Sequence, residues 1–242
     1  MQTSTAPWLG GRYWIALLLA SSCATNLGDL LPDVLNLKPL EELGACIALV
    51  AVGALGALAM KGREVFFWLA ALMLCAAATA LADLAVNDAH LGFAMAGAGA
   101  LVLLVMLLMV QSMTRAGIQD PFSTNALFWI TFLIAGVLGT ILADGIGHAF
   151  PSVKIGVPVS ALLATLAVLA AVGTVVRYRL QIGIAYWAAI VAARWWGTNI
   201  GDIVKFLTSF AVSIGVFAVL LLLVLFLWRA RGESNGVRTQ VS

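Results

Sequence analysis

The sequence predicts an all-α integral membrane protein, with eight transmembrane helices built from four parallel two-helix repeats around a pseudo-fourfold axis. Three observations predict this fold: consecutive apolar runs of membrane length, basic residues gathered on one side of these runs, and a motif that recurs four times. Of the 242 residues, 63% are hydrophobic and 10% are charged, and the mean hydropathy is +1.06. Soluble domains carry about 25% charged residues, so a bilayer is the expected solvent. In a bilayer, a helix pairs its backbone N–H and C=O groups within itself, so helices are the expected spans. The period-two alternation of apolar and polar residues that marks a membrane β-barrel is absent.

Each apolar run approaches the roughly 20 residues needed to cross about 30 Å of hydrocarbon. The odd-numbered runs carry the recurring motif, whereas the even-numbered runs are rich in small residues such as Gly53, Gly56, Gly97 and Gly99, which predicts close packing there. In chain order the predicted helices are Tyr13–Leu31, Leu43–Met60, Val65–Val86, Leu91–Met113, Asn125–His148, Ile155–Val176, Ile182–Phe206 and Ser209–Trp228. We expect a single membrane domain over 1–242, with repeats at about 12–62, 63–115, 122–180 and 181–231 and a cytoplasmic tail at 232–242.

The basic residues predict the orientation, because cytoplasmic loops carry an excess of Lys and Arg. One side of the eight-helix arrangement holds nine basic residues and the other holds three, while Arg194 falls within a helix. Both termini are therefore expected in the cytoplasm. The nine are Arg12, Lys61, Arg63, Arg115, Arg177, Arg179, Arg229, Arg231 and Arg238, and the three are Lys38, Lys154 and Lys205.

The recurring motif is an aromatic residue, Trp, ten residues, Thr, three residues and Asp. Its spacing is identical in all four copies, and Thr and Asp are uncommon inside membrane helices, so chance is a poor explanation. The copies are Tyr13-Trp14 with Thr25 and Asp29, Phe67-Trp68 with Thr79 and Asp83, Phe128-Trp129 with Thr140 and Asp144, and Tyr186-Trp187 with Thr198 and Asp202.

Helical geometry puts the Trp, Thr and Asp of each copy on one stripe, since a helix turns about 100° per residue. The Trp is expected at the cytoplasmic interface as an anchor, and the Asp lies about 22 Å further along the axis. Each repeat contains two helices, so all motif helices run in the same direction. Four Thr and four Asp should therefore share one depth in the outer half of the membrane.

These motifs, together with the segment Arg194-Trp-Trp-Gly-Thr-Asn-Ile-Gly-Asp202, resemble a family of bacterial four-repeat membrane proteins defined by a repeat of unknown function, often called "uncharacterized membrane-anchored protein". The resemblance covers nearly the whole chain. It implies a multi-pass protein of the bacterial inner membrane, and it implies no activity. Family members often carry a second acid about four residues after the first. Asp33 and Asp88 fit that pattern, whereas His148 and Lys205 stand at similar places in the other two repeats.

Ionisable residues inside a membrane are functional candidates because their burial is expensive, about 2.5–3.5 kcal/mol for a central Asp. Bound cations, protons or counter-ions should compensate them. Arg194 and Lys205 are the predicted counter-ions, and an outer vestibule is predicted from Asp33, Asp88, His90 and His148. The predicted ion- or substrate-binding residues are Asp29, Asp83, Asp144, Asp202, Thr25, Thr79, Thr140, Thr198, Asn26 and Asn199, and the four Asp are also candidate metal ligands.

Eight of the eleven acids lie on the outer side against three Lys, a net charge of about −5 if all titrate normally. Such a vestibule concentrates cations. Carboxylate and hydroxyl oxygens suit hard divalent ions, while two His favour a transition metal, so a divalent metal ion is a candidate cofactor. The overall charge of +2 and the lack of a basic cluster exclude nucleic acid.

We therefore expect a small transporter or permease for a cation, either a metal ion or a proton-coupled substrate, and no enzymatic activity. Gly28 and Gly201, which directly precede motif Asp residues, could loosen the helices there. One alternative is a structural or accessory protein whose Thr-x3-Asp pairs only lock helices together. A lesser alternative is a membrane enzyme acting on a lipid. The expected partners are the bilayer and a small cation, with a homo-oligomer left open.

Overall fold

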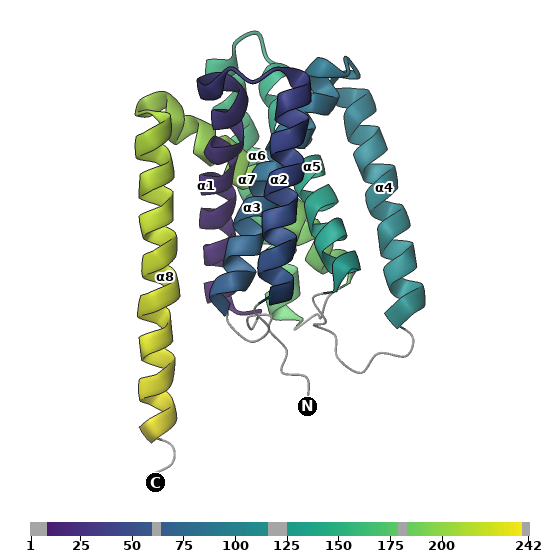
Figure 1. The fold of residues 1–242 in the computed structure, drawn as a ribbon. Helices are drawn as coiled ribbons and strands as arrows, with labels where there is room; N and C mark the ends of the chain where they lie inside the picture. Colours follow the sequence, from purple (N-terminus) through teal and green to yellow (C-terminus); the bar gives the residue numbers. More distant parts are fainter. Residues whose placement is uncertain (1–8, 60–63, 116–124, 179–182, 239–242) are drawn as a thin grey trace.

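The computed structural model describes residues 9–59, 64–115, 125–178 and 183–238, and every element within these ranges is a helix (Figure 1). The all-α prediction is confirmed. In chain order the elements are α1 (Gly11–Leu35), α2 (Pro39–Ala59), α3 (Glu64–Asp83), the π-helical turn η1 (Leu84–Asp88), α4 (Gly92–Arg115), α5 (Ala126–His148), α6 (Val153–Arg177), α7 (Ile184–Leu207) and α8 (Phe210–Arg238).

Five helices in the described ranges are long and apolar enough to cross a membrane, which is the composition of a membrane protein. In α2 the described side chains form a shorter apolar stretch, Gly44–Gly56. Helices α1 and α7 are long, with 25 and 24 residues, but polar side chains such as Asn26 and Arg194 interrupt them. The five spans are Glu64–Asp88, Gly92–Thr114, Ala126–His148, Val153–Arg177 and Phe210–Leu227.

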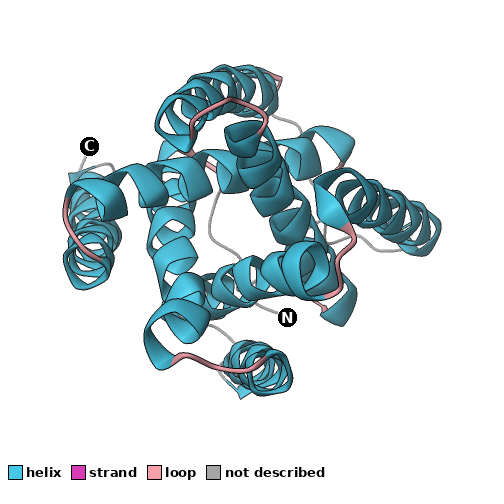
Figure 2. Cartoon of the chain, turned by 90° about the horizontal axis from the view of Figure 1, so that it is seen from above, coloured by secondary structure: helices cyan, strands magenta, loops and turns pink. Residues whose placement is uncertain are grey.

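The four odd-numbered helices form an inner ring in which each contacts its two neighbours (Figure 2). Helices α1 and α5 each contact both α3 and α7. The even-numbered helices pack outside this ring, each against the odd-numbered helix that follows it, and α8 packs against α1. The apolar windows of α3 and α5 are 67% and 61% buried, against 17% for those of α4 and α8. The odd-numbered helices therefore make the core.

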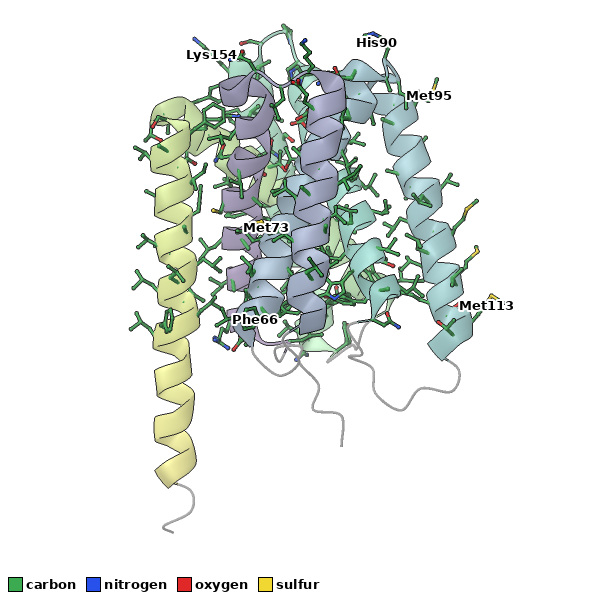
Figure 3. All side chains as sticks on the ribbon, viewed as in Figure 1. Phe66, Met73, His90, Met95, Met113 and Lys154 are labelled. Atoms are coloured by element: carbon green, nitrogen blue, oxygen red, sulfur yellow. The ribbon has the colours of Figure 1, made fainter. Side chains whose placement is uncertain are left out.

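The outer helices expose apolar side chains in the manner of a lipid-facing surface. On α4, Met95 and Met113 point away from the bundle (Figure 3) and are 64% and 78% exposed. On α6, Leu166 and Leu169 are also exposed. A hydrocarbon solvent makes this surface favourable, whereas water would not.

Glycine brings the inner helices into close contact with one another, and Gly156 of α6 packs in the same way on the backbone of Gly147 of α5. A Cβ added at Gly28 of α1 would lie 2.7 Å from Ala76 O of α3, and one at Gly139 of α5 would lie 2.6 Å from Arg194 Cβ of α7. Gly56 and Gly99 on the outer helices have no atom within 4 Å of such a Cβ. The prediction of close small-residue packing in the even-numbered helices is therefore wrong for Gly56 and Gly99, whereas a Cβ at Gly53 or Gly97 would lie 3.4 Å from side chains of the neighbouring inner helix.

The helix boundaries differ from the predicted ones by a few residues at most ends. Helix α2 begins at Pro39, four residues before the predicted start, because proline is favourable in a first helical turn. Helix α3 changes to a π-helical turn after Asp83. Helix α8 extends to Arg238, ten residues beyond the predicted end, so the expected tail 232–242 begins as helix.

Candidate functional site

A cavity of about 410 Å³ lies at the end of the inner ring where the odd-numbered helices finish. This is termed the cavity end, and the opposite end of the ring is termed the aromatic end. Side chains from all four odd-numbered helices line the cavity, including every motif Asp. The predicted site residues in its lining are Thr25, Asp29, Thr79, Asp83, Asp88, Asp144, His148, Thr198, Asp202 and Lys205.

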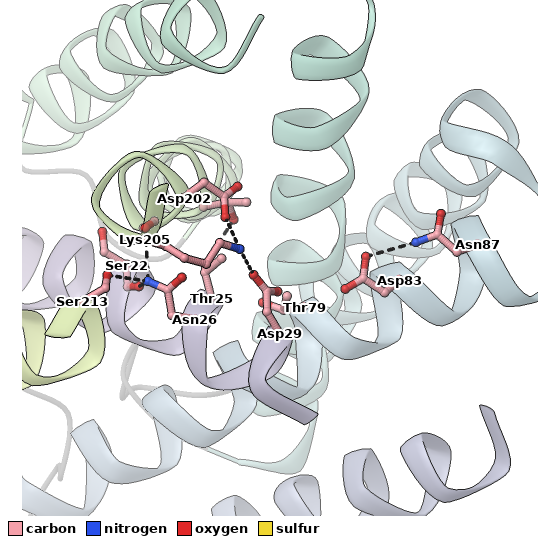
Figure 4. A network of polar contacts seen from close by, with 12 residues as sticks. Ser22, Thr25, Asn26, Asp29, Thr79, Asp83, Asn87, Asp202, Lys205 and Ser213 are labelled. Atoms are coloured by element: carbon pink, nitrogen blue, oxygen red, sulfur yellow. Dashed lines mark hydrogen bonds and ion pairs between the residues drawn. The ribbon is translucent and has the colours of Figure 1, made fainter. Parts of the chain in front are cut away.

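Lys205 neutralises one side of the cavity. Its Nζ lies 2.6 Å from Asp29 Oδ2 and 2.9 Å from Asp202 Oδ1, so it bridges α1 and α7 (Figure 4). The three side chains are 15–17% exposed. The ammonium also faces the Phe210 ring, 5.0 Å from its centroid, which adds a cation–π contact. Lys205 was predicted as a counter-ion, and the aromatic partner was missed because it follows on the next helix.

The π-helical turn η1 shapes the opposite wall of the cavity. It inserts one extra residue per turn after Asp83, and Asn87 and Asp88 both line the cavity. Asn87 Nδ2 donates to Asp83 Oδ1 at 3.5 Å (Figure 4). Such turns often occur at functional sites. Asn87 was not predicted, although its position four residues after Asp83 is a signal that could have found it.

Asp144 and His148 complete the wall contributed by α5. His148 Nδ1 lies 2.8 Å from the backbone oxygen of Asp144. The imidazole stacks on Phe93 of α4, with ring centroids 5.4 Å apart. This contact orients the ring at the rim, since His148 itself is exposed.

The lining contains five carboxylates and one ammonium group, a net charge of −4 if each group carries its ordinary charge. A concave acidic wall of this kind attracts cations and raises their local concentration. The oxygen atoms of Asp and Thr can accept hydrogen bonds from the water shell of a hydrated cation, or from a cation that carries its own protons. The lining therefore suits cation binding.

No three His, Cys, Asp or Glu side chains in the described ranges are placed to hold one metal ion together. The four motif Asp come from different helices around a wide cavity, and Lys205 occupies the space between two of them. The described geometry does not bring Asp29, Asp83, Asp144 and Asp202 together as a preformed metal centre, and their role as metal ligands stays a prediction.

Below the cavity, the motif threonines surround the guanidinium of Arg194. Its Nη1 donates to Ser21 O at 3.0 Å and Thr25 Oγ1 at 3.2 Å, and its Nη2 donates to Thr79 Oγ1 at 2.5 Å and Thr140 Oγ1 at 3.0 Å. The fourth threonine, Thr198, has its Oγ1 3.4 Å from that of Thr25.

Arg194 is only 1% exposed, and its hydrogen bonds join α7 to α1, α3 and α5. Its direct partners are thus hydroxyl and carbonyl oxygens, and its predicted role as counter-ion to the Asp residues stays a prediction. The Ser21 carbonyl was missed, since backbone acceptors carry no sequence signal. Thr140 does not line the cavity but belongs to this arginine–threonine layer.

Three predicted site residues lie away from the cavity. Asn26 bridges helices, because its Nδ2 donates to Ser213 Oγ at 2.7 Å and Gly201 O at 3.2 Å. Asn199 donates to Trp195 O within its own helix at 2.9 Å. His90 is exposed beside the start of α4 (Figure 3) and does not contribute to the lining.

None of these three residues lines the cavity, and their binding or vestibule role stays a prediction. Helical periodicity explains the asparagines, because each follows its motif Thr directly and is rotated about 100° off the stripe. Asp33 lies in α1, but its side chain falls outside the described residues.

The aromatic pairs of the motif close the other end of the ring. Trp14, Trp68 and Trp187 are 3%, 2% and 1% exposed, so their predicted role as interface anchors is wrong. They pack in the core instead, where Tyr13 and Tyr186 share a 2.7 Å hydroxyl–hydroxyl hydrogen bond. Aromatic rings thus fill the ring interior opposite the cavity.

Comparisons with protein-family models, curated proteins and solved structures give no significant match. The resemblance to the four-repeat family therefore stays a prediction, and the functional argument depends on the geometry of the cavity.

Proposed function

We propose that this protein is a small membrane transporter that binds a cation in the acidic cavity. One observation carries the proposal: four Asp residues from four helices, distant in sequence, line the same cavity. They are Asp29, Asp83, Asp144 and Asp202. Ionisable groups within a membrane bundle are expensive and mark ion or substrate pathways. Helix packing alone does not require four carboxylates at one level.

The proposal includes eight transmembrane helices in four parallel repeats about a pseudo-fourfold axis. Support comes from the cyclic packing, since each outer helix contacts the inner helix that follows it, and α8 closes the cycle on α1. Asp29 and Arg194, two of the charged residues that make α1 and α7 less apolar, face the cavity and the arginine–threonine layer, respectively. Polar residues on the inner side of a bundle are compatible with a transmembrane helix.

In a bacterial inner membrane, the cavity end would face outward and both termini would be cytoplasmic. The excess of Lys and Arg at the aromatic end supports this orientation. So does the placement of the start of α1 and the end of α8 at the same end of the bundle (Figure 1). A cation would then enter the cavity from outside.

The geometry favours a proton, or a cation that keeps part of its water shell, over a dehydrated metal ion. Direct metal ligation needs several side chains converging on one point, and no such group occurs among the described residues. A volume of about 410 Å³ leaves room for a cation with ordered water. Lys205 is an example of a protonated cation bound in this cavity, because carboxylate oxygens of Asp29 and Asp202 bind its ammonium group.

A structural role for the Thr-x3-Asp pairs is the second candidate, and the hydrogen bonds of Arg194 favour it for the threonines. Thr79 and Thr140 serve as acceptors for the guanidinium and so connect α3 and α5 with α7. This role does not extend to the carboxylates of Asp83 and Asp144, which line the cavity. The two candidates therefore differ in what they predict for the Asp residues.

The test is cation uptake into proteoliposomes, with H⁺, K⁺, Mg²⁺ and Mn²⁺ as probes in separate assays. The purified protein should take up at least one of them, and Asp83→Asn combined with Asp144→Asn should reduce that uptake at least tenfold. Glu41→Gln is the matched control, because Glu41 is exposed on α2 and lies outside the cavity lining. If the wild type moves none of the probes, or the double variant transports normally, the structural role is the better description.

A further inference from the structure

Arg194 is a buried cation at the junction of all four inner helices. It belongs to α7, and its terminal nitrogens reach Thr25 of α1, Thr79 of α3 and Thr140 of α5. The guanidinium therefore crosses the interior of the ring between the cavity and the aromatic end. A cation that moved along the ring interior from the cavity would have to pass it.

Helix α5 makes room for the arginine at two glycines. A Cβ on Gly139 would lie 2.6 Å from Arg194 Cβ, and one on Gly136 would lie 3.9 Å from Arg194 Nε. The Nε itself is buried and has no hydrogen-bond partner within the described ranges. The side chain is thus held by its stem and its two terminal nitrogens. This fit fixes the position of the charge along the ring interior.

The charge of Arg194 opposes the passage of a cation. A guanidinium group stays protonated in proteins, and fixed positive charges in narrow pathways exclude cations. The carboxylates of the cavity attract a cation as far as the threonines, where repulsion from Arg194 begins. Further along, the ring interior holds aromatic side chains such as Tyr13 and Tyr186, which lie within the buried core.

We propose that Arg194 is the electrostatic barrier that closes the inner side of the acidic cavity to cations. A cation binds in the cavity but does not cross the ring while the threonines hold the guanidinium. This inference rests on the proposed cation site and adds to it the residue that prevents leakage. In a working transporter, the hydrogen bonds to Thr79 and Thr140 would have to break before the ion could pass.

The test is passive cation leakage from proteoliposomes loaded with K⁺, measured with valinomycin-free vesicles and a K⁺-sensitive dye. Arg194→Gln should increase K⁺ leakage at least tenfold over wild type, whereas Arg194→Lys, which keeps the charge, should stay within about threefold. Arg12→Gln is the matched control, because it removes the same charge from the aromatic end, where Arg12 pairs with Glu64. Size-exclusion profiles establish that each variant is folded.

Leakage of Arg194→Gln at the level of wild type and Arg12→Gln would overturn the barrier. Should Arg194→Gln not fold, Thr79→Val combined with Thr140→Val tests the same idea, since it removes two acceptors and leaves the charge loosely held. That variant should leak at least threefold more than wild type, and wild-type leakage would overturn the barrier. Probe uptake by the wild type is measured separately, so a failed transport function and a failed barrier give different results.

Discussion

The Nζ of Lys205 lies 2.6 Å from Asp29 Oδ2, although 176 positions separate the two residues in sequence. The same nitrogen pairs with Asp202 on its own helix at 2.9 Å. The cavity thus already binds one cation, which is covalently attached to the chain. A soluble cation entering the cavity meets a wall that Lys205 has partly neutralised, and the two cations compete for the same carboxylate oxygens.

Replacing Lys205 with Met should therefore strengthen cation binding in the cavity. A unit charge about 4 Å away opposes a second cation by about 4 kcal/mol at an effective dielectric constant of about 20, so an increase in affinity of at least tenfold is expected. Isothermal titration with Mg²⁺ in detergent solution measures it. The increase should be larger for Mg²⁺ than for K⁺, because the repulsion scales with the charge of the ligand.

Lys154→Met is the control for this prediction, since Lys154 is exposed at the same end of the bundle and lies outside the cavity lining (Figure 3). It should change the Mg²⁺ affinity by less than about twofold. Equal effects of the two substitutions would mean that Lys205 acts only through the overall charge, and the competition described above would be wrong.

Glycine substitutions should separate the inner contacts from the outer ones. Gly139→Ala should lower the stability of the bundle by about 1–3 kcal/mol through overpacking, because the new Cβ would lie 2.7 Å from the backbone oxygen of Val191. Gly99→Ala on α4 should be neutral or slightly stabilising, as nothing lies within 4 Å of its Cβ. Thermal unfolding in the same detergent compares them, and equal losses would contradict the tight packing of the inner ring.

Much of the fold could be predicted because the hydropathy of the apolar runs, the short loops between them and the spacing of the motif all depend on residues near each other in the sequence. The eight helices, and the shared stripe of Thr25 and Asp29, follow from a rise of 1.5 Å and a turn of 100° per residue. The convergence of the Asp residues on one cavity was expected on the same grounds. The cavity lining agrees with that expectation.

The rest depends on contacts between distant segments, which no local pattern encodes. Arg194 was expected to face carboxylates, but its direct partners are threonines, because Gly136 and Gly139 of α5 make room for its side chain at that level. Trp14 was expected at a membrane interface, yet it packs inside the ring. An amphipathic ring fits either environment, and only the arrangement of neighbouring helices decides between them.

The arginine–threonine layer should contribute to stability through its hydrogen bonds. Thr79→Val removes one of the two acceptors of Arg194 Nη2 and leaves a buried charge with one partner fewer, which should cost about 1–3 kcal/mol. Thr174→Val is the control, because Thr174 is exposed and donates only to Ala170 O in its own helix. Thermal unfolding of both variants in detergent measures the difference. A loss no greater than that of the control would mean that the hydroxyl of Thr79 is dispensable.

The hydroxyl pair at the aromatic end should show coupling in a double-mutant cycle. Tyr13 and Tyr186 are 2% and 1% exposed, and their oxygens lie 2.7 Å apart. Tyr13→Phe or Tyr186→Phe alone removes this hydrogen bond, so the double variant should be less destabilised than the sum of the two single variants. Coupling between polar side chains in membrane bundles is about 0.6 kcal/mol on average and reaches about 1.7 kcal/mol, and a dry aromatic core favours the upper part of that range. Tyr178→Phe, at a side chain that is 70% exposed, should have no effect. Additive losses from the two single variants would mean that the two hydroxyl groups do not stabilise each other, and that the rings close the aromatic end by packing alone.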